Sequence, residues 1–290
     1  TITRCSKDAV SQYNFKEENI MVVQHNLSAM NTNRQMGVVT SALQKSTEKL
    51  SSGYKINRAG DDAAGLSISE KMRSQIRGLN KASDNAQDGI SLIQVAEGAL
   101  NETHSILQRM NELATQAAND TNTSVDRQSI KDEIEQLNEE LDRISTTTQF
   151  NKQDLLTGGF SGKLQVGALE GQTMDVKISL AVSAKGLKVS AVEVSTNAKA
   201  GAAMQSIQDA IESVSKQRSK LGAIQNRLEH TINNLDTNAE NTQAAESRIR
   251  DTDMAEEMVS YSKNNILMQA GQSMLAQANQ QNQGVLSLLQ

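Results

Sequence analysis

The sequence predicts a mainly α fold: a long antiparallel, coiled-coil-like helical bundle with a small β-hairpin region, in which discontinuous nested domains are built from both halves of the chain. Three observations predict it. The 290 residues include no proline and no tryptophan, and aromatic residues make up only 2%, a composition that permits long uninterrupted helices. Apolar residues recur every three or four positions over long runs. Two such runs of similar length flank a central stretch with period 2.

Residues 1–20 show no sustained periodicity and contain the only cysteine, Cys5. Within this stretch, the codons for Lys16-Glu17-Glu18 can spell a ribosome-binding sequence, a few nucleotides before the codon for Met21. We therefore expect Met21 to be the natural start and residues 1–20 to be a non-native or disordered extension.

The segment 21–56 is predicted to form the first helix, because its apolar residues follow a helical period. A polar, glycine-containing stretch then predicts a connecting segment at 57–67. Ser67 and Glu70 have the spacing of a capping box, so a new helix is expected from residue 68.

The run from 68 to 119 carries the clearest helical pattern in the chain. Its apolar seam steps by three or four residues throughout, which is the a/d pattern of packed helices. At 1.5 Å per residue this helix would be about 78 Å long and would need partner helices along its length. The seam residues are Leu79, Ala82, Ala86, Ile90, Ile93, Ala96, Leu100, Thr103, Leu107, Met110, Ala114 and Ala117.

A turn at 119–123 separates this rod from a shorter helix, for which Ser124 is the predicted N-cap. The pattern changes at Phe150. Residues 158–197 are glycine-rich and then alternate apolar with polar side chains, which predicts a β-hairpin around Glu170-Gly171-Gln172. Leu187 and Val189 predict one further short strand.

The helical period returns at 198–250, a run of about 80 Å that matches the 68–119 rod. We therefore expect 68–157 and 198–250 to form one bundle domain, with 158–197 as its β-hairpin region. The last segment, 254–290, matches 21–56 in length and is expected to pair with it. Two helices leave much of their apolar surface exposed, so this pair should be weakly ordered until another molecule covers it.

Charge and motifs exclude several functions. The net charge is −5 and the pI about 5.4, so a nucleic acid partner is not expected. No apolar run is long enough for membrane insertion. The histidines His25, His104 and His230 lack ligand partners at metal spacing, and no HExxH motif occurs. We therefore expect no metal, no cofactor, no catalytic residues and no enzymatic activity.

Several motifs resemble those of the bacterial flagellin family over nearly all of 22–290. The stretch Leu50–Asn57 followed by Ala59 and Asp61–Gly65 reads LSSGYKIN-x-A-x-DDAAG, which is specific to flagellins and their close relatives. LQRMNELATQAAN at Leu107–Asn119 and the end of the chain from Ser247 strengthen the resemblance. Only about 50 residues separate Phe150 from the third long helix, so the resemblance is to a short form without the variable outer domains.

The resemblance implies a secreted structural subunit of the bacterial flagellar filament, which self-assembles for swimming motility. The terminal pair, 21–56 with 254–290, would form the inner filament layer. The implied partners are further copies of the chain, an export chaperone of the type III pathway at the C-terminal helix, filament cap and junction proteins, and a flagellin-recognising host Toll-like receptor. The receptor-binding positions carried over from the family are Arg109, Leu113 and Glu133. From spacing alone, they are a solvated arginine and a leucine at the rim of the core.

The terminal apolar stripes are the predicted polymerisation residues, because helices that fold when neighbours cover them can propagate a filament. They are Val39, Leu43, Leu50, Leu267, Met274, Leu275, Val285, Leu286 and Leu289. Two alternatives share parts of the pattern: a hook–filament junction protein, and a coiled-coil secretion scaffold or adhesin module.

Overall fold

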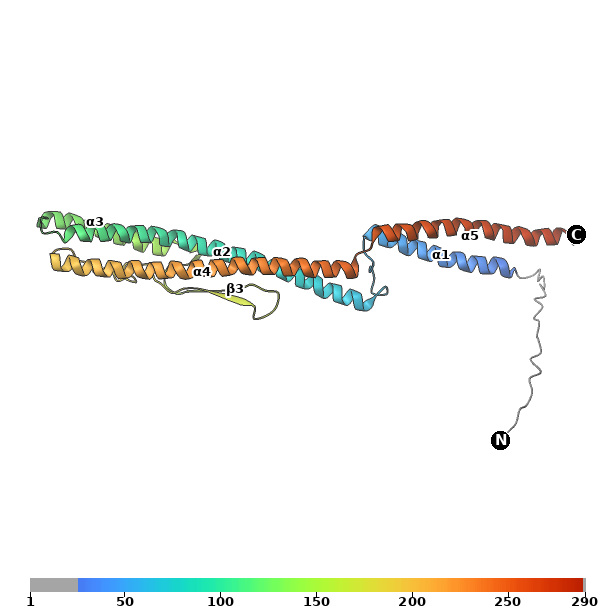
Figure 1. The fold of residues 1–290 in the computed structure, drawn as a ribbon, viewed down its shortest axis with the longest axis horizontal. Coiled ribbons are helices and arrows are strands. Elements are labelled where there is room, and N and C mark those ends of the chain that lie inside the picture. Colours follow the sequence, from blue (N-terminus) through green and yellow to red (C-terminus); the bar gives the residue numbers. More distant parts are fainter. Residues whose placement is uncertain (1–25, 289–290) are drawn as a thin grey trace, which may run out of the picture. The chain divides into compact units, whose positions relative to one another are not determined.

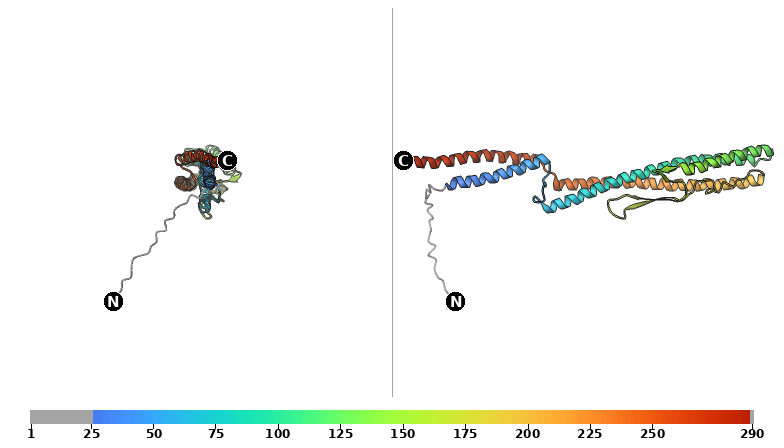
Figure 2. Two further views of the ribbon diagram at one scale, coloured as in Figure 1. Left: turned by 90° about the vertical axis from the view of Figure 1, so that its right-hand side faces the viewer. Right: turned by 180° about the vertical axis from the view of Figure 1, so that it is seen from behind.

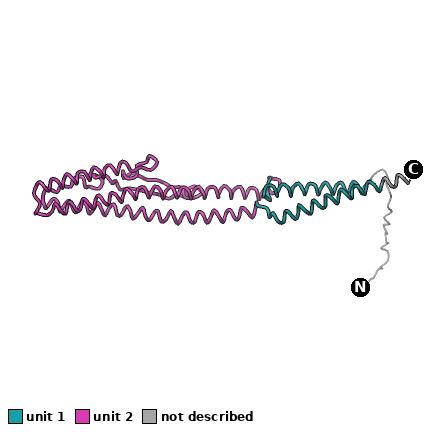
Figure 3. The backbone as a smooth tube through the Cα atoms, turned by 90° about the horizontal axis from the view of Figure 1, so that it is seen from above, with its two compact units in different colours: residues 1–57, 251–290 teal, residues 58–250 magenta. Residues whose placement is uncertain are grey.

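A computed structural model describes residues 26–288 of the chain, and side chains as far as residue 281. The predicted extension at 1–20 and the predicted polymerisation residue Leu289 lie outside the described residues. The described chain divides into two compact units (Figure 3). The terminal unit combines the segment that ends at Asn57 with the segment that starts at Asp251, and the central unit is Arg58–Arg250.

The terminal unit is an antiparallel pair of helices, α1 (Leu27–Ser52) and α5 (Met254–Leu288). Asn26 caps α1 by accepting from the Ala29 N–H, and its amide donates to the Ala278 carbonyl oxygen of α5 over 2.9 Å. At the other end, Gly53 stops α1 in the left-handed region at φ 76° and accepts from the Thr252 N–H. A polar contact therefore fixes the register at each end of the pair.

The central unit is built on two long antiparallel helices, α2 (Ala63–Ala117) and α4 (Asn197–Arg250), about 83 and 81 Å long by their residue counts (Figures 1 and 2). Of the twelve predicted seam residues of α2, eleven are buried and Ile90 is half-buried. Three cross-links set the antiparallel register: Glu70 with Arg250, Ser83 with Asp236, and Glu97 with Arg218. The predicted helical bundle is confirmed.

Two helices start earlier than predicted, in both cases because a side chain upstream of the predicted start caps the helix. Helix α2 begins five residues early, at Ala63, because the Asp62 carboxylate accepts from the Gly65 N–H over 2.9 Å. The capping box predicted at Ser67 and Glu70 is therefore wrong, and the last six residues of the predicted connecting segment include the N-cap and first helical turn.

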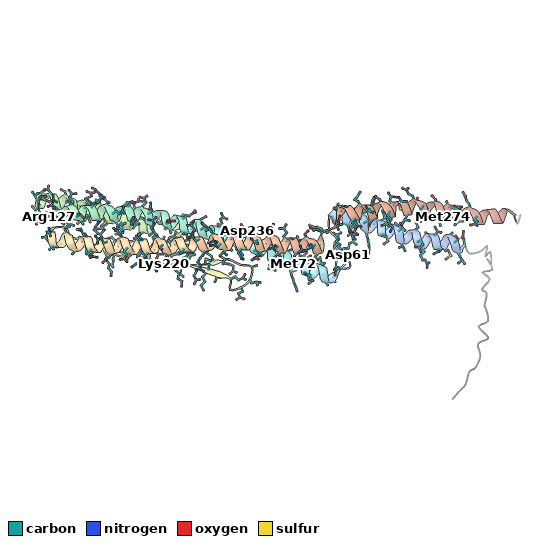
Figure 4. The ribbon with its side chains drawn as sticks, viewed as in Figure 1. Asp61, Met72, Arg127, Lys220, Asp236 and Met274 are labelled. Carbon is teal, nitrogen blue, oxygen red and sulfur yellow. The ribbon has the colours of Figure 1, made fainter. Side chains whose placement is uncertain are left out.

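Helix α3 (Ser124–Thr147) is capped by Thr123, so the N-cap predicted at Ser124 is wrong by one residue. Thr123 and Asp126 form a reciprocal capping box: the Thr123 hydroxyl accepts from the Asp126 N–H, and the Asp126 carboxylate accepts from the Thr123 N–H over 2.9 Å. These hydrogen bonds favour the ionised carboxylate and lower the pKa of Asp126. Arg127, labelled in Figure 4, is at the same end. It donates to the Ala117 carbonyl and pairs with Asp120.

The β region contains two hairpins. The predicted one is β3 (Phe160–Gln165) with β4 (Thr173–Ile178), paired so that Leu164 lies opposite Met174. An unpredicted one, β1 (Gln149–Phe150) with β2 (Gln153–Asp154), turns at Asn151 and Lys152, both at positive φ as a type I′ turn requires.

The strand predicted around Leu187 and Val189 is wrong. Both side chains are buried, which produced the alternating pattern, but their backbones form turns: the Leu187 N–H donates to Ser183 and the Val189 N–H to Ala184.

Two glycines of α2 allow the β3–β4 hairpin to lie on the helix. A Cβ atom at Gly78 would come within 2.9 Å of the Ala168 Cβ, and one at Gly89 within 2.3 Å of Leu164 Cδ1. Between them, the Asn85 amide donates to the Gln165 carbonyl oxygen over 3.2 Å. These contacts fix the position of the hairpin along α2, between Gly78 and Gly89.

Candidate assembly interface

Helix α5 exposes a broad apolar surface. Its side towards α1 is formed by half-buried or buried residues, among them Met268, Leu275 and Ala278. At 100° per residue, other apolar side chains lie on the remaining surface, where no described residue of the terminal unit covers them. These exposed residues are Met254, Met258, Val259, Ile266, Leu267 and Met274, with exposed fractions between 44% and 69%; Met274 is labelled in Figure 4.

Helix α1 has a second apolar face beside the one that meets α5. Leu27, Met30 and Val38 are each more than 60% exposed. Next to Val38 a shallow depression of about 490 Å³ is flanked by Arg34 and Lys45. Both α1 and α5 thus expose large apolar side chains. The exposed apolar surface is larger than is expected for a pair of helices that stays isolated in water.

The charge pattern of the terminal unit is uneven. Lys49 in the last turn of α1 and Glu257 in the first turn of α5 form an ion pair over 3.4 Å. From Asn264 to Gln290 the sequence contains no charged residue, and asparagine and glutamine supply most of its polar groups. Contacts along this half of α5 therefore depend on apolar burial and neutral hydrogen bonds, which salt screens little.

The predicted polymerisation residues fall into three groups. Val39, Leu43 and Leu50 are half-buried on α1, and Leu275 is half-buried on α5. Leu267 and Met274 belong to the exposed surface of α5. The side chains of Val285, Leu286 and Leu289 are beyond the described ones.

The predicted polymerisation set lacks seven exposed apolar residues of α1 and α5. The spacing of Leu27, Met30 and Val38, with Arg34 between, is itself helical and marks a second stripe beside the one at 39 and 43. On α5 the set lacks Met254 and Met258, and also Val259 and Ile266, which are one heptad apart. A search for more than one stripe per helix could have found them.

The positions carried over for receptor binding lie where α2 meets α3, in the central unit. Arg109 Nε donates to Glu133 Oε1 over 3.0 Å, and a second guanidinium nitrogen pairs with Glu112 over 3.2 Å. The hydrogen bond that Arg109 donates to Glu133, and then the one it donates to Glu112, raise the pKa of Arg109. Arg109 and Glu133 are exposed. Leu113 is only 2% exposed and belongs to the main core, so its predicted place at the rim is wrong: α3 packs over that side of α2.

Between residues 26 and 281, no three histidine, cysteine or acidic side chains gather closely enough to hold a metal ion. None of the described helices has a stretch both long and apolar enough to cross a membrane.

Comparison with known proteins gives two family matches. The bacterial flagellin N-terminal helical region matches residues 23–161, and the bacterial flagellin C-terminal helical region matches residues 204–289. A flagellin of Halalkalibacterium halodurans is 56% identical over 271 residues, covering 93% of this chain and all of that protein. A flagellin of Bacillus subtilis is 51% identical over 304 residues with the same coverage. The crystal structure of Bacillus cereus flagellin is 34% identical, covers 56% of this chain and 94% of that one, and has a TM-score of 0.48.

Proposed function

The chain belongs to the bacterial flagellin family and is a structural subunit of the flagellar filament; we propose that it polymerises through the exposed apolar surfaces of α1 and α5. One observation carries this proposal: each helix of the terminal unit shows large apolar side chains that the other does not cover. Burial of such surface contributes roughly 25 cal/mol per Å². In a polymer with heterologous contacts this gain repeats at every added subunit.

We expect hydrogen exchange to separate the two units on polymerisation. In the monomer, the described side chains of α1 and α5 include almost no fully buried ones, so the amides of these helices should exchange fast, whereas the seam amides of α2 and α4 should be protected. In filaments formed with a precipitating salt and checked by negative-stain electron microscopy, the amides of α1 and α5 should slow at least tenfold. The α2 and α4 amides serve as the internal control. Filaments in which α1 and α5 exchange at the monomer rate would contradict the proposal.

The place of each unit in the filament and the remaining partners are proposals that follow from the family. The terminal unit would form the inner filament layer, and the central unit with its hairpins would form the layer outside it. The export chaperone would bind α5, whose exposed methionines suit a partner-binding surface. Cap and junction proteins would contact the same terminal helices, and the assembled filament would be extracellular. Identity at full length with flagellins favours the filament subunit over the junction protein and the secretion scaffold.

A second role, as ligand of the flagellin-recognising Toll-like receptor, is favoured by the exposed Arg109–Glu133 pair. Because Glu133 and Glu112 already orient the guanidinium, it is held in place for a partner at little further entropic cost. Leu113 would support this surface from beneath, since it is buried.

We expect Arg109→Ala to lower receptor activation by monomeric protein at least tenfold in a reporter-cell assay, with unchanged circular dichroism. Arg143→Ala is the matched control: Arg143 is an exposed arginine on α3 that pairs only with Glu140 of its own helix among the described residues. Equal activation by both variants would count against this surface.

A further inference from the structure

The methionines of the chain are unevenly distributed between the two units. The sequence has eleven, and the structure describes the side chains of all but Met21. Six of these ten lie on α1 and α5, which are 26 and 35 residues long, whereas the much longer central unit has four. The helices that expose the candidate interface are therefore the methionine-rich part of the described chain.

Exposure divides these ten methionines in the same way. In the central unit, Met110 and Met174 are buried in the main core, and Met72 and Met204 are half-buried. The exposed ones all lie on the terminal unit, with exposed fractions between 47% and 65%: Met30, Met254, Met258 and Met274. A small oxidant in water thus reaches the side chains of the terminal unit first.

Methionine differs from the other apolar residues of this surface because a mild oxidant changes it reversibly. A lone pair of the thioether sulfur attacks one oxygen of hydrogen peroxide, the O–O bond breaks and an S–O bond forms. The sulfur loses two electrons, and the displaced hydroxide takes up the remaining proton and leaves as water. Methionine sulfoxide reductases reverse the change: the oxygen leaves as water while two thiols become a disulfide. Leucine, isoleucine and valine have no such reaction.

Oxidation changes what this surface can bury. The thioether becomes a strongly polar sulfoxide, and a polar group that is buried without a hydrogen-bond partner is destabilising. In the monomer an exposed sulfoxide stays hydrated, and the central unit keeps its core because Met110 and Met174 are buried there. In a filament that covers α1 and α5, the cost would recur at every subunit added.

We propose that Met30, Met254, Met258 and Met274 form a redox-sensitive modification site. A peroxide oxidises them in the unassembled subunit and blocks its polymerisation, and a thiol-dependent sulfoxide reductase restores it. The inference rests on the proposed assembly through α1 and α5, because the four side chains are accessible only until these surfaces are covered. Free subunits are therefore sensitive to peroxide, and assembled filaments are resistant.

Oxidation of the monomer tests the site. The full chain with Cys5→Ser, which removes the only thiol, is treated with hydrogen peroxide. The reaction is quenched with free methionine when peptide mass spectrometry finds the four exposed methionines oxidised. We expect these four to react at least tenfold faster than Met110 and Met174. The critical concentration for polymerisation should rise at least tenfold, with unchanged circular dichroism of the monomer.

Reduction is the second half of the same test. Because a sulfoxide is chiral, both stereospecific reductases are added with a thiol. The critical concentration should return to within twofold of that of untreated protein. Oxidised subunits that polymerise like untreated ones would overturn the site, and so would a loss of polymerisation that the reductases do not reverse.

Two fourfold leucine variants locate the effect, since leucine has a similar volume and no sulfur. In the first, all four exposed methionines are replaced, and polymerisation should be normal both before and after peroxide. The matched control carries Met72→Leu, Met110→Leu, Met174→Leu and Met204→Leu, and should lose polymerisation on oxidation as the parent does. Equal loss in both variants would refute the assignment. If the first variant does not assemble even untreated, oxidation and reduction of the parent decide the question alone.

Hydrogen exchange distinguishes failure of this site from failure of the assembly surface. Filaments in which the α1 and α5 amides slow as expected, formed by subunits that also tolerate oxidation, would refute the redox site and keep the interface. Filaments in which these amides exchange, and the four methionines oxidise, at the monomer rates would refute both.

Discussion

Replacement of Met274 by aspartate is expected to stop polymerisation while the monomer keeps its fold. Met274 is 58% exposed on α5, so a carboxylate there remains hydrated in the monomer and costs little. In a filament that covers this surface, the carboxylate would be buried. Residues 264–288 of α5 contain no arginine or lysine to neutralise it within the same helix, and an unpaired buried charge costs several kcal/mol. That penalty repeats at every subunit added.

The measurement is the critical concentration for salt-induced polymerisation, followed by light scattering and electron microscopy. Gln272→Asp is the matched control: it adds the same charge to the same turn, but Gln272 is an exposed polar residue about 160° away around the helix. We expect no filaments from Met274→Asp at ten times the critical concentration of the unchanged protein. The assignment of this surface to the interface is wrong if Met274→Asp polymerises as readily as Gln272→Asp.

Leu275→Asp separates the two sides of α5. Leu275 is half-buried on the side towards α1, so this variant should also loosen the helical pair within the monomer. Circular dichroism of the two monomeric variants then separates the effects. Helix content should fall in Leu275→Asp, which disturbs the α1–α5 pair, and stay unchanged in Met274→Asp, which disturbs only the interface between subunits.

The sequence was sufficient to predict the long helices because their pattern repeats many times. The α2 seam steps through twelve positions, and a signal of that length outweighs any single exception. Element ends depend on one or two side chains, and there the prediction failed: Asp62 caps α2 although Ser67 and Glu70 carry the better-known motif. The two-residue strands β1 and β2 have no periodicity to detect, and only the positive φ values of Asn151 and Lys152 reveal their turn.

The candidate interface was harder to predict than the fold because periodicity shows that a stripe is apolar without showing which partner covers it. On α5, the predicted stripe combined Met274, which is exposed, with Leu275, which faces α1. Leu113 poses the same problem on α2. Its spacing relative to the seam suggests the rim of the core, and only the position of α3 places it inside.

Truncation of Leu107 to alanine is expected to cause the largest loss of stability in the central unit. Leu107 is fully buried in the main core, to which α2, α3, α4 and the β region all contribute side chains. A cavity surrounded by several elements cannot close by moving one of them. Leucine-to-alanine changes in such places lower the free energy of unfolding by about 2–5 kcal/mol.

Leu79 of the same helix provides the matched comparison. It is 7% exposed and belongs to a small separate cluster with Ala82, Leu235 and Ala239; among the described residues, only Ala168 of the hairpin also packs against this cluster. Two helices can approach each other and water can enter at such a site, so Leu79→Ala should cost less than about 2 kcal/mol. Denaturant unfolding of the monomer, followed by circular dichroism, measures both values. Because the two variants delete the same atoms from the same helix, the difference between them reports the covering by α3 and the β region alone. Equal losses would mean that the α2–α4 seam determines stability evenly along its length, and that the surrounding elements add nothing to it.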